Sequence, residues 1–191
     1  MSSIQLSELR EQDLPFLLEL WRMPEGMRYA DEFPGLRGWA KKDDPTTAWR
    51  LYQEQRARHG PAYTQLIICL VDTAPGTPIG ESVILPLPEQ YTFRRWKKPE
   101  GVPTVMGDVK LLPQQWERGL GTAAMRQVVA WVFRHTDVDI FIVPPHRLNP
   151  AAGRVYEKVG FRWFPGSLSY RGHQVMTLNR EQVGQMEGES A

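Results

Sequence analysis

The chain has 191 residues, 41% of them hydrophobic and 24% charged, and its 23 basic and 22 acidic residues leave a formal charge of +1. This composition excludes a disordered chain and is typical of one compact domain with a buried core. Balanced charge gives no general field for nucleic acid or an anionic membrane, so neither is expected as a partner. No apolar run reaches the roughly 18 residues of a membrane-spanning helix.

The ends of the chain and its cysteine content predict a cytoplasmic location. The N-terminus lacks the basic segment and apolar run of a secretory signal, and the single cysteine, Cys69, cannot form an internal disulfide. The four histidines show no metal-ligand spacing with carboxylates or cysteines, so no metal site is predicted. We expect one domain over residues 1–180 and a flexible tail over residues 181–191.

The first half of the chain begins with a strand and two helices. Residues 4–9 alternate like a short strand, and Asp13 is the predicted N-cap of the helix that follows. Asp44 and Pro45 begin a second helix, which Gly60 can end.

A predicted hairpin follows these helices. Residues 63–72 read as a buried strand, residues 79–87 pair back against it, and residues 88–103 are expected to form a surface excursion.

In the second half strands and helices alternate. Apolar residues recur every fourth position in the helix predicted over residues 119–135, as in a helix that lies on a sheet. The sequence therefore predicts a mixed α/β or α+β domain. The remaining predicted elements are strands at 104–112 and 138–143, a helix at 150–159, and late strands around 161–164 and 173–178.

A glycine turn is the most informative segment. In DVKLLPQQWERGLGTAAM a strand ends, a short loop follows, and Gly119 and Gly121 open a long helix. Unpaired backbone N–H groups and the helix dipole can hold a phosphate or pyrophosphate at such a helix start, and Arg118 could add a contact. A P-loop string is absent, and a dinucleotide fingerprint would need glycine at Ala124. A turn that binds nothing stays open as the alternative.

Three segments together resemble the GNAT superfamily of acetyltransferases. They are WERGLGT (116–122), LNPAAGRVYEKVGF (148–161), and Val175-Met176 on a late strand. The resemblance implies a mixed, largely antiparallel central sheet of about 6–7 strands flanked by about 4 helices, with acetyl-CoA as cofactor. One departure is Trp116, which stands where the family usually has Gln or Arg.

The resemblance also implies individual roles in cofactor binding. The strand before the turn would receive the pantetheine arm, the turn itself the pyrophosphate, and Tyr156 would protonate the departing thiolate. Asn149 would bind pantetheine or order the next helix, although an N-cap before Pro150 fits it equally well. For Tyr156 a packed helical tyrosine is the alternative. The predicted cofactor residues are Leu111, Leu112, Arg118, Gly119, Leu120, Gly121, Thr122, Asn149, Ala152 and Tyr156.

Direct attack by an amine requires its neutral form, so a base is useful. Asp108, on the strand that leads into the glycine turn, is the favoured candidate, and Glu81 on the hairpin strand is the competitor. Alternation along the strand would place Asp108, Lys110 and Leu112 on one face. A structural or surface carboxylate is the alternative for both acids.

The acceptor is predicted less sharply. The motifs are similar to those of aminoglycoside 6′-N-acetyltransferases and of ribosomal-protein N-terminal acetyltransferases, with a small-molecule amine slightly favoured. The residues predicted to bind it are Trp21, Tyr29, Asp31, Tyr91 and Asp108. A non-catalytic acyl-CoA sensor remains an alternative, and a homodimer stays open.

Overall fold

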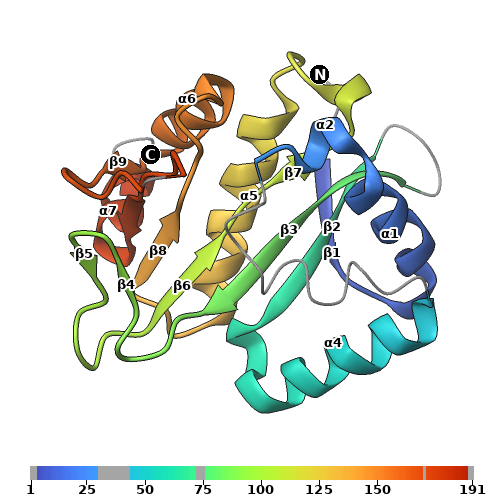
Figure 1. Ribbon diagram of the computed structural model, residues 1–191, viewed down its shortest axis with the longest axis horizontal. Coiled ribbons are helices and arrows are strands. Elements are labelled where there is room, and N and C mark those ends of the chain that lie inside the picture. The colour runs from blue at the N-terminus through green and yellow to red at the C-terminus, as the bar shows by residue number, and fades with distance from the viewer. Residues whose placement is uncertain (1–3, 30–43, 72–75, 170, 189–191) are drawn as a thin grey trace.

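The computed structural model describes residues 4–29, 44–71, 76–169 and 171–188. Within them, eight strands form one sheet in the order β1-β2-β3-β6-β8-β10-β9, and β7 pairs with β3 beyond the end of β6 (Figure 1). Every described pairing is antiparallel except the parallel pair β6–β8. The strands are β1 (Ile4–Glu8), β2 (Thr64–Leu70), β3 (Thr77–Pro86), β6 (Thr104–Gly107), β7 (Lys110–Leu111), β8 (Ile140–Val143), β9 (Arg162–Trp163) and β10 (Met176–Asn179), with β4 (Thr92–Phe93) and β5 (Trp96–Lys97) as a separate hairpin.

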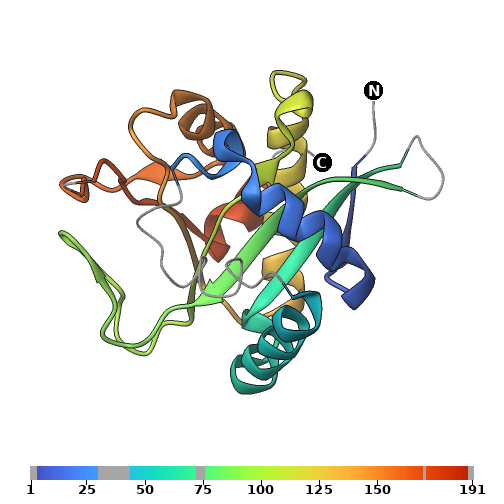
Figure 2. The ribbon, with the colours of Figure 1, turned by 45° about the vertical axis from the view of Figure 1, so that its right-hand side comes forward.

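Helices cover both faces of this sheet (Figures 1 and 2). On one face, α5 and α6 pack over a core that includes Val128, Phe141 and Tyr156. On the other, α1 and α4 pack over Ile67 and Val83. The helices are α1 (Leu14–Arg22), α2 (Pro24–Met27), α4 (Pro45–His59), α5 (Leu120–His135), α6 (Pro150–Val159) and α7 (Arg180–Gly188), with short 3₁₀ turns η1 (Glu11–Asp13), η2 (Gly60–Ala62) and η3 (Pro113–Gln115).

This architecture confirms the predicted fold class, and the local signals explain most of it. The Asp44 carboxylate accepts hydrogen bonds from the amides of Thr46 and Thr47, so it caps α4 as expected. Asp13 precedes α1, but its side chain does not cap the helix, because the carboxylate is paired with Arg10. The apolar stripe of α5 is buried throughout.

The last described residues form a helix, α7. Arg180 begins α7 and donates hydrogen bonds to the carbonyls of Phe133, Thr136 and Val138. These carbonyls lie at and just beyond the C-terminal end of α5, where a helix lacks internal donors. The start of α7 is therefore anchored to α5.

The strand predicted over residues 104–112 is interrupted. Pairing with β3 lapses at Asp108 and Val109, between β6 and β7. Pairing with β8 ends at Met106 and Ile142, while β8 goes on to pair with β10. Beyond this point β7 and the end of β8 are no longer hydrogen-bonded to each other, and the sheet opens between them.

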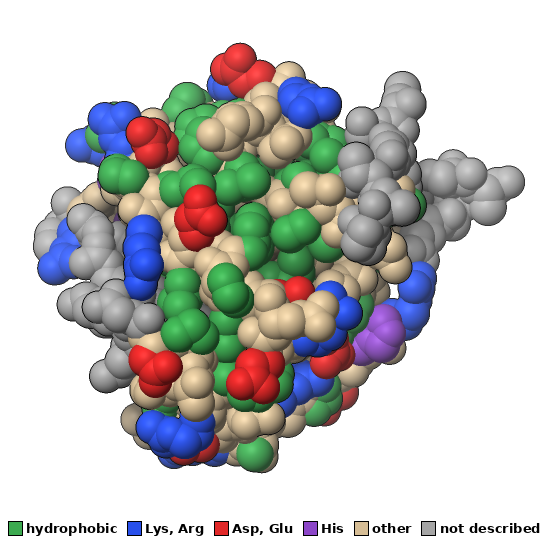
Figure 3. Space-filling view, turned by 90° about the vertical axis from the view of Figure 1, so that its right-hand side faces the viewer, with side chains coloured by type: hydrophobic (Ala, Val, Ile, Leu, Met, Phe, Trp, Pro, Cys, Tyr) green, Lys and Arg blue, Asp and Glu red, His purple; other side chains and the backbone are tan. Residues whose placement is uncertain are grey.

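The surface carries charges of both signs. Viewed from the right-hand side of Figure 1, hydrophobic side chains gather in the middle of the face, and acidic and basic side chains lie around them (Figure 3). In the described part of the chain, no helix has the length and apolarity needed to cross a membrane.

Candidate active site

A cleft of about 1160 Å³ lies where the sheet opens. One wall is formed by the segment from Met106 to Leu111, and the other by Pro144–His146 and α6. The cleft reaches the start of α5 at one end and α2 with Tyr29 at the other. Its volume exceeds that of a site for a single drug-sized ligand, so it can hold two reactants.

The start of α5 provides an anion-binding end to this cleft. Gly119 lies in the left-handed region with φ 76°, and no side chain caps the helix. The first amides of α5 therefore have no partner within the helix, and the helix dipole adds partial positive charge there. Gly119, Gly121 and Thr122 all line the cleft. Such an end is suited to a phosphate or pyrophosphate.

Trp116 occupies the mouth of the cleft beside this turn. Its indole nitrogen donates a hydrogen bond of 2.9 Å to the Leu111 carbonyl, and 45% of the residue remains exposed. The bond fixes the loop between β7 and α5. Arg118 does not line the cleft, because its guanidinium is bonded to Gln115 instead.

Helix α6 brings Asn149 and Tyr156 to the opposite wall. Asn149 Oδ1 accepts from the Ala152 amide at 3.1 Å, so it is the N-cap of α6, and it also lines the cleft. Tyr156 is 5% exposed and borders the cleft opposite Asp108. Burial raises the pKa of Tyr156, and the charge of Asp108 adds to the rise. The phenol therefore keeps its proton at neutral pH.

A buried ionic cluster lies behind the cleft wall formed by β7. Glu81 is fully buried and accepts hydrogen bonds from Trp21 Nε1 at 2.7 Å, from Lys110 Nζ at 3.1 Å, and from Gln65 Nε2. Lys110 Nζ also donates to Asp108 Oδ2. Asp108 lines the cleft. Its second oxygen, Oδ1, is buried and has no hydrogen-bond partner among the described residues.

The pKa values in this cluster reflect burial and mutual attraction. Burial raises the pKa of Glu81, and the Lys110 ammonium works against that rise. Burial alone would lower the pKa of Lys110, but the charges of Asp108 and Glu81 outweigh it and the pKa lies above its ordinary value. Lys110 is therefore an ammonium at neutral pH.

Tyr29 connects the chain just after α2 to the second wall, at the other end of the cleft. Its hydroxyl donates to the Leu148 carbonyl at 3.0 Å, and its ring stacks on His146 with centroids 4.8 Å apart. His146 accepts from the Leu148 amide at Nδ1, which leaves Nε2 to donate to the Arg171 carbonyl. With both ring nitrogens engaged, His146 serves to hold this end together.

The structure therefore brings most of the predicted site residues together. Those that line the cleft are Tyr29, Asp108, Leu111, Gly119, Gly121, Thr122, Asn149, Ala152 and Tyr156. Asp31 lies outside the described residues.

Six predicted site residues do not line the cleft. The Leu112 and Leu120 side chains pack into the hydrophobic layers on either side of the sheet, and Arg118 is turned away. Trp21 and Glu81 are buried in the ionic cluster. Tyr91 packs beside Trp96 at the β4–β5 hairpin.

Several cleft residues were not predicted. Lys110 could have been suggested by its place two residues after Asp108 on one strand face. Arg154 and Lys158, four residues apart on α6, add positive charge to the α6 wall. Val83, Leu85 and Met106 add apolar side chains to the cleft, and local sequence gives no signal for them.

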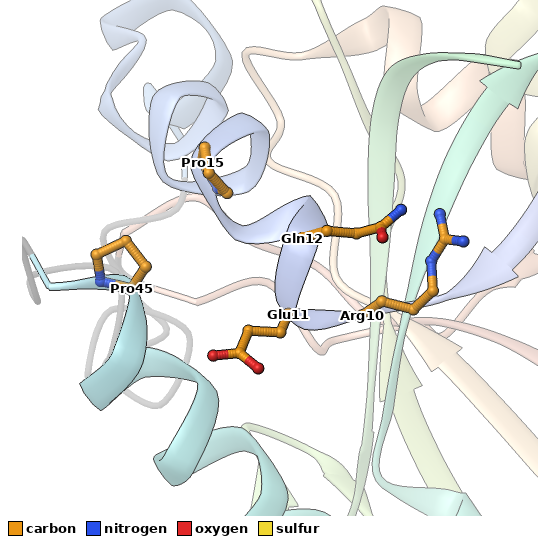
Figure 4. Close-up of a pocket in the computed structure, with 5 residues that line it drawn as sticks. All are labelled: Arg10, Glu11, Gln12, Pro15 and Pro45. Carbon is orange, nitrogen blue, oxygen red and sulfur yellow. The ribbon is translucent and has the colours of Figure 1, made fainter. Parts of the chain in front are cut away.

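A second hollow, near η1 and the start of α4, has none of these features. It is lined by Arg10, Glu11, Gln12, Pro15 and Pro45. Figure 4 shows Glu11 pointing away from Arg10 and Gln12, so the polar groups do not converge on one point. Within the described residues, no group of three or more His, Cys, Asp or Glu side chains could hold a metal.

Comparison with known families identifies the class to which this fold and cleft belong. A family model for the acetyltransferase (GNAT) domain matches residues 3–162. The chain therefore belongs to the GNAT acetyltransferase family and is an acyl-CoA-dependent N-acetyltransferase, as the sequence motifs predicted. Acetyl-CoA, the predicted cofactor, follows from this membership.

Solved structures with the same fold include two acetyltransferases of small amines. Aminoglycoside acetyltransferase AAC(6')-Ib, in complex with coenzyme A and kanamycin, is 22% identical with a TM-score of 0.70, over 97% of this chain and 99% of that one. Spermidine N-acetyltransferase from Vibrio cholerae, in complex with CoA and spermine, is 17% identical with a TM-score of 0.66, over 94% of this chain and 96% of that one. At these identities the likeness concerns the fold.

Proposed function

We propose that this enzyme transfers an acetyl group from acetyl-CoA directly to a primary amine of a small molecule. The observation that carries the proposal is the single cleft that runs from the start of α5 to the Asp108 carboxylate, with Tyr156 on the facing wall. The acceptors of the two structural neighbours, kanamycin and spermine, are small polyamines, which supports this class of acceptor.

The residues present fit acetyl-CoA. The α5 amides beside Gly119 would hold its pyrophosphate, and Arg154 and Lys158 stand on the same cleft for its phosphates. Leu111, Ala152 and Asn149 would line the pantetheine arm. When bound, acetyl-CoA supplies an activated acyl group.

Asp108 is proposed as the base. It lines the cleft and 23% of its side chain is exposed, so it is placed to bind an ammonium group and to accept its proton. Glu81 has no such access, because it is fully buried and already accepts three hydrogen bonds. Tyr156 is proposed as the acid, with its Oη proton passing to the departing sulfur.

The acceptor side of the cleft combines one carboxylate with an apolar wall. Val83, Leu85 and Met106 would contact the carbon skeleton beside the amine, while Asp108 would bind the amine itself. Nothing in this proposal requires a metal or a covalent acyl-enzyme. The cytoplasmic location predicted from the sequence belongs to the same proposal.

The test combines acetyl-CoA binding by calorimetry with a free-thiol release assay on a panel of amines. The panel includes kanamycin-type aminoglycosides, spermine and spermidine, simple alkylamines, and short peptides with free N-termini. Micromolar binding with thiol release on small amines is the expected result. Release on peptides alone would instead indicate a protein N-terminal acetyltransferase, and binding without release on any amine would indicate a sensor. Absence of binding would contradict the proposal altogether.

A further inference from the structure

We infer that Lys110 and Glu81 are positioning residues that hold the Asp108 carboxylate in place at the cleft. The inference deepens the proposed function, since it rests on the role proposed there for Asp108. Sequence analysis left Glu81 as a competitor of Asp108 for the role of base. The inference instead gives Glu81 the role of holding Lys110, which in turn holds Asp108.

Register places the three groups in a row. Glu81 on β3 pairs directly with Lys110 on β7, and Asp108 lies two residues before Lys110, between β6 and β7. Directly opposed residues of an antiparallel pair lie within contact distance, and the Asp108 carboxylate is bonded to the same ammonium. The Lys110 ammonium therefore reaches both carboxylates.

The hydrogen-bond partners of Glu81 indicate which protonation state its side chain adopts. Trp21 Nε1 and Lys110 Nζ can only donate, and Gln65 donates through its amide nitrogen. A protonated Glu81 would need an acceptor for its own proton, so the environment matches the ionised carboxylate. That carboxylate offsets the charge of Lys110, whose side chain is only 9% exposed.

Lys110 is held from a third direction by an aromatic ring. Its Nζ lies 5.4 Å from the centre of the Trp21 ring, within the range of a cation–π contact. Lys110 is thus fixed between β3, α1 and its own strand. A donor fixed in this way restrains Asp108 Oδ2, and with it the position of the Asp108 carboxylate at the cleft.

The charges of the cluster favour a cationic partner. Two carboxylates and one ammonium leave one net negative charge, and Asp108 is the carboxylate of the two that lines the cleft. An amine that arrives as an ammonium ion neutralises this charge, so the cluster attracts the protonated form of the acceptor. The other ionisable groups bordering the cleft near this point are Glu25, Arg28, Tyr29, His146, Tyr156 and His173.

The first test does not depend on turnover. The carboxyl ¹³C resonance of Asp108, assigned with Asp108→Asn, is titrated in the unaltered protein and in Lys110→Met. Loss of the neighbouring positive charge is expected to move the titration midpoint upward. Lys110→Arg keeps the positive charge, so the titration midpoint should stay close to that of the unaltered protein. Lys97→Met makes the same change as Lys110→Met on the exposed hairpin and should leave the midpoint unchanged.

The second test measures kcat/KM against pH with the amine identified by the panel. Lys110→Met should lower kcat/KM at least tenfold, with the acidic limb displaced to higher pH, while the Kd for CoA changes less than twofold. If Lys110→Met fails to fold, Glu81→Gln/Lys110→Met removes both charges together and carries the test. A purely structural role would lower the activity equally at every pH.

The outcomes separate this inference from the proposed function. An unmoved Asp108 titration in both Lys110 variants, with acetylation intact in the unaltered protein, would overturn the positioning role. A displaced titration in a protein that acetylates no amine would leave the positioning role standing and overturn the proposed function.

Discussion

Individual side chains in this site are held by partners from distant parts of the chain. The Tyr29 hydroxyl and the Leu148 carbonyl are 119 residues apart in sequence, and Trp21 and Glu81 are 60 apart. Such bonds fix rotamers before any ligand arrives, which lowers the entropy lost on binding. Tyr156 is fixed differently, by burial among Phe141, Phe161 and other apolar residues.

Replacement of Tyr156 by Phe tests the proposed acid. Phenylalanine keeps the ring packing and removes only the hydroxyl, so the fold and the Kd for CoA should stay unchanged. Loss of a general acid is expected to lower kcat by about 10²–10⁴. Steady-state thiol release and calorimetry measure the two quantities. Tyr52→Phe in α4, a buried tyrosine outside the cleft, is the matched control, and equal kcat values in the two variants would contradict the assignment.

At the scale of elements, each end of α5 has a distinct task. The first turn presents free amides to the cleft, and the last turn is closed by Arg180 from α7. The two ends can therefore be changed independently.

Gly119→Ala should weaken CoA binding. The glycine has φ 76°, where an alanine costs about 1–2 kcal/mol, although a Cβ there would meet no atom within 4 Å. Relief of that strain would turn the first amides of α5 away from the cleft, and we expect the Kd for CoA to rise about tenfold, or roughly 1.4 kcal/mol.

The control for this change is Gly184→Ala in α7. A Cβ at Gly184 would also meet no atom within 4 Å, but unlike Gly119 this residue is not in the left-handed region. It should leave the Kd unchanged and slightly stabilise the helix. Calorimetric titration of CoA into both variants checks the prediction. Equal Kd values would show that the turn does not hold the cofactor.

Arg180→Met should destabilise the protein without affecting the site. Hydrogen bonds from a charged group to buried carbonyls contribute about 2 kcal/mol in total here, so Tm is expected to fall by about 4–8 °C. The exposed Arg134 in the last turn of α5 provides the control, and Arg134→Met should change stability by less than about 0.5 kcal/mol. An unaltered Tm in Arg180→Met would mean that α7 is not anchored in this way.

At the scale of the whole molecule, the sheet and its covering helices follow closely from the sequence. Apolar periodicity predicted α5, and the Asn149-Pro150 and Asp44-Pro45 pairs predicted where α6 and α4 begin, because these signals act within one or two turns. The glycine turn at Gly119 and Gly121 was predicted for the same reason, because its signal also lies within a few residues.

What the sequence could not predict depends on register and on long-range contact. The pairing of Glu81 with Lys110 is set by the alignment of two strands, and no local pattern specifies it. The opening between β7 and β8 is likewise a property of the sheet. Tyr91 was expected at the acceptor because the resemblance places the loop between strands beside the acceptor; in the structure its ring packs beside Trp96.

Stability of the molecule at alkaline pH should depend on Tyr63. Burial raises the pKa of Tyr63 from 10.0 to about 12. Between these values the unfolded chain releases the phenol proton and the folded chain keeps it, so the free energy of unfolding falls as the pH rises through this window. The contribution of the protonated Tyr63 phenol to the free energy of unfolding is fully present below pH 10.

Tyr63→Phe should make this alkaline loss of stability smaller, and urea midpoints from pH 9 to 12 measure it. Part of the loss will remain, because burial also raises the pKa of Tyr156. Identical pH dependence in the variant and the unaltered protein would contradict the assignment to Tyr63.

The opening between β7 and β8 also has a kinetic consequence. Alternation along β7 places Leu111 on the α5 face and Lys110 on the α1 face, so the cleft passes from one side of the sheet to the other. Acetyl-CoA at the start of α5 and an amine at Asp108 would then occupy different parts of the cleft, so both can be bound at once. We therefore expect a ternary complex, with CoA as a competitive product inhibitor against acetyl-CoA alone.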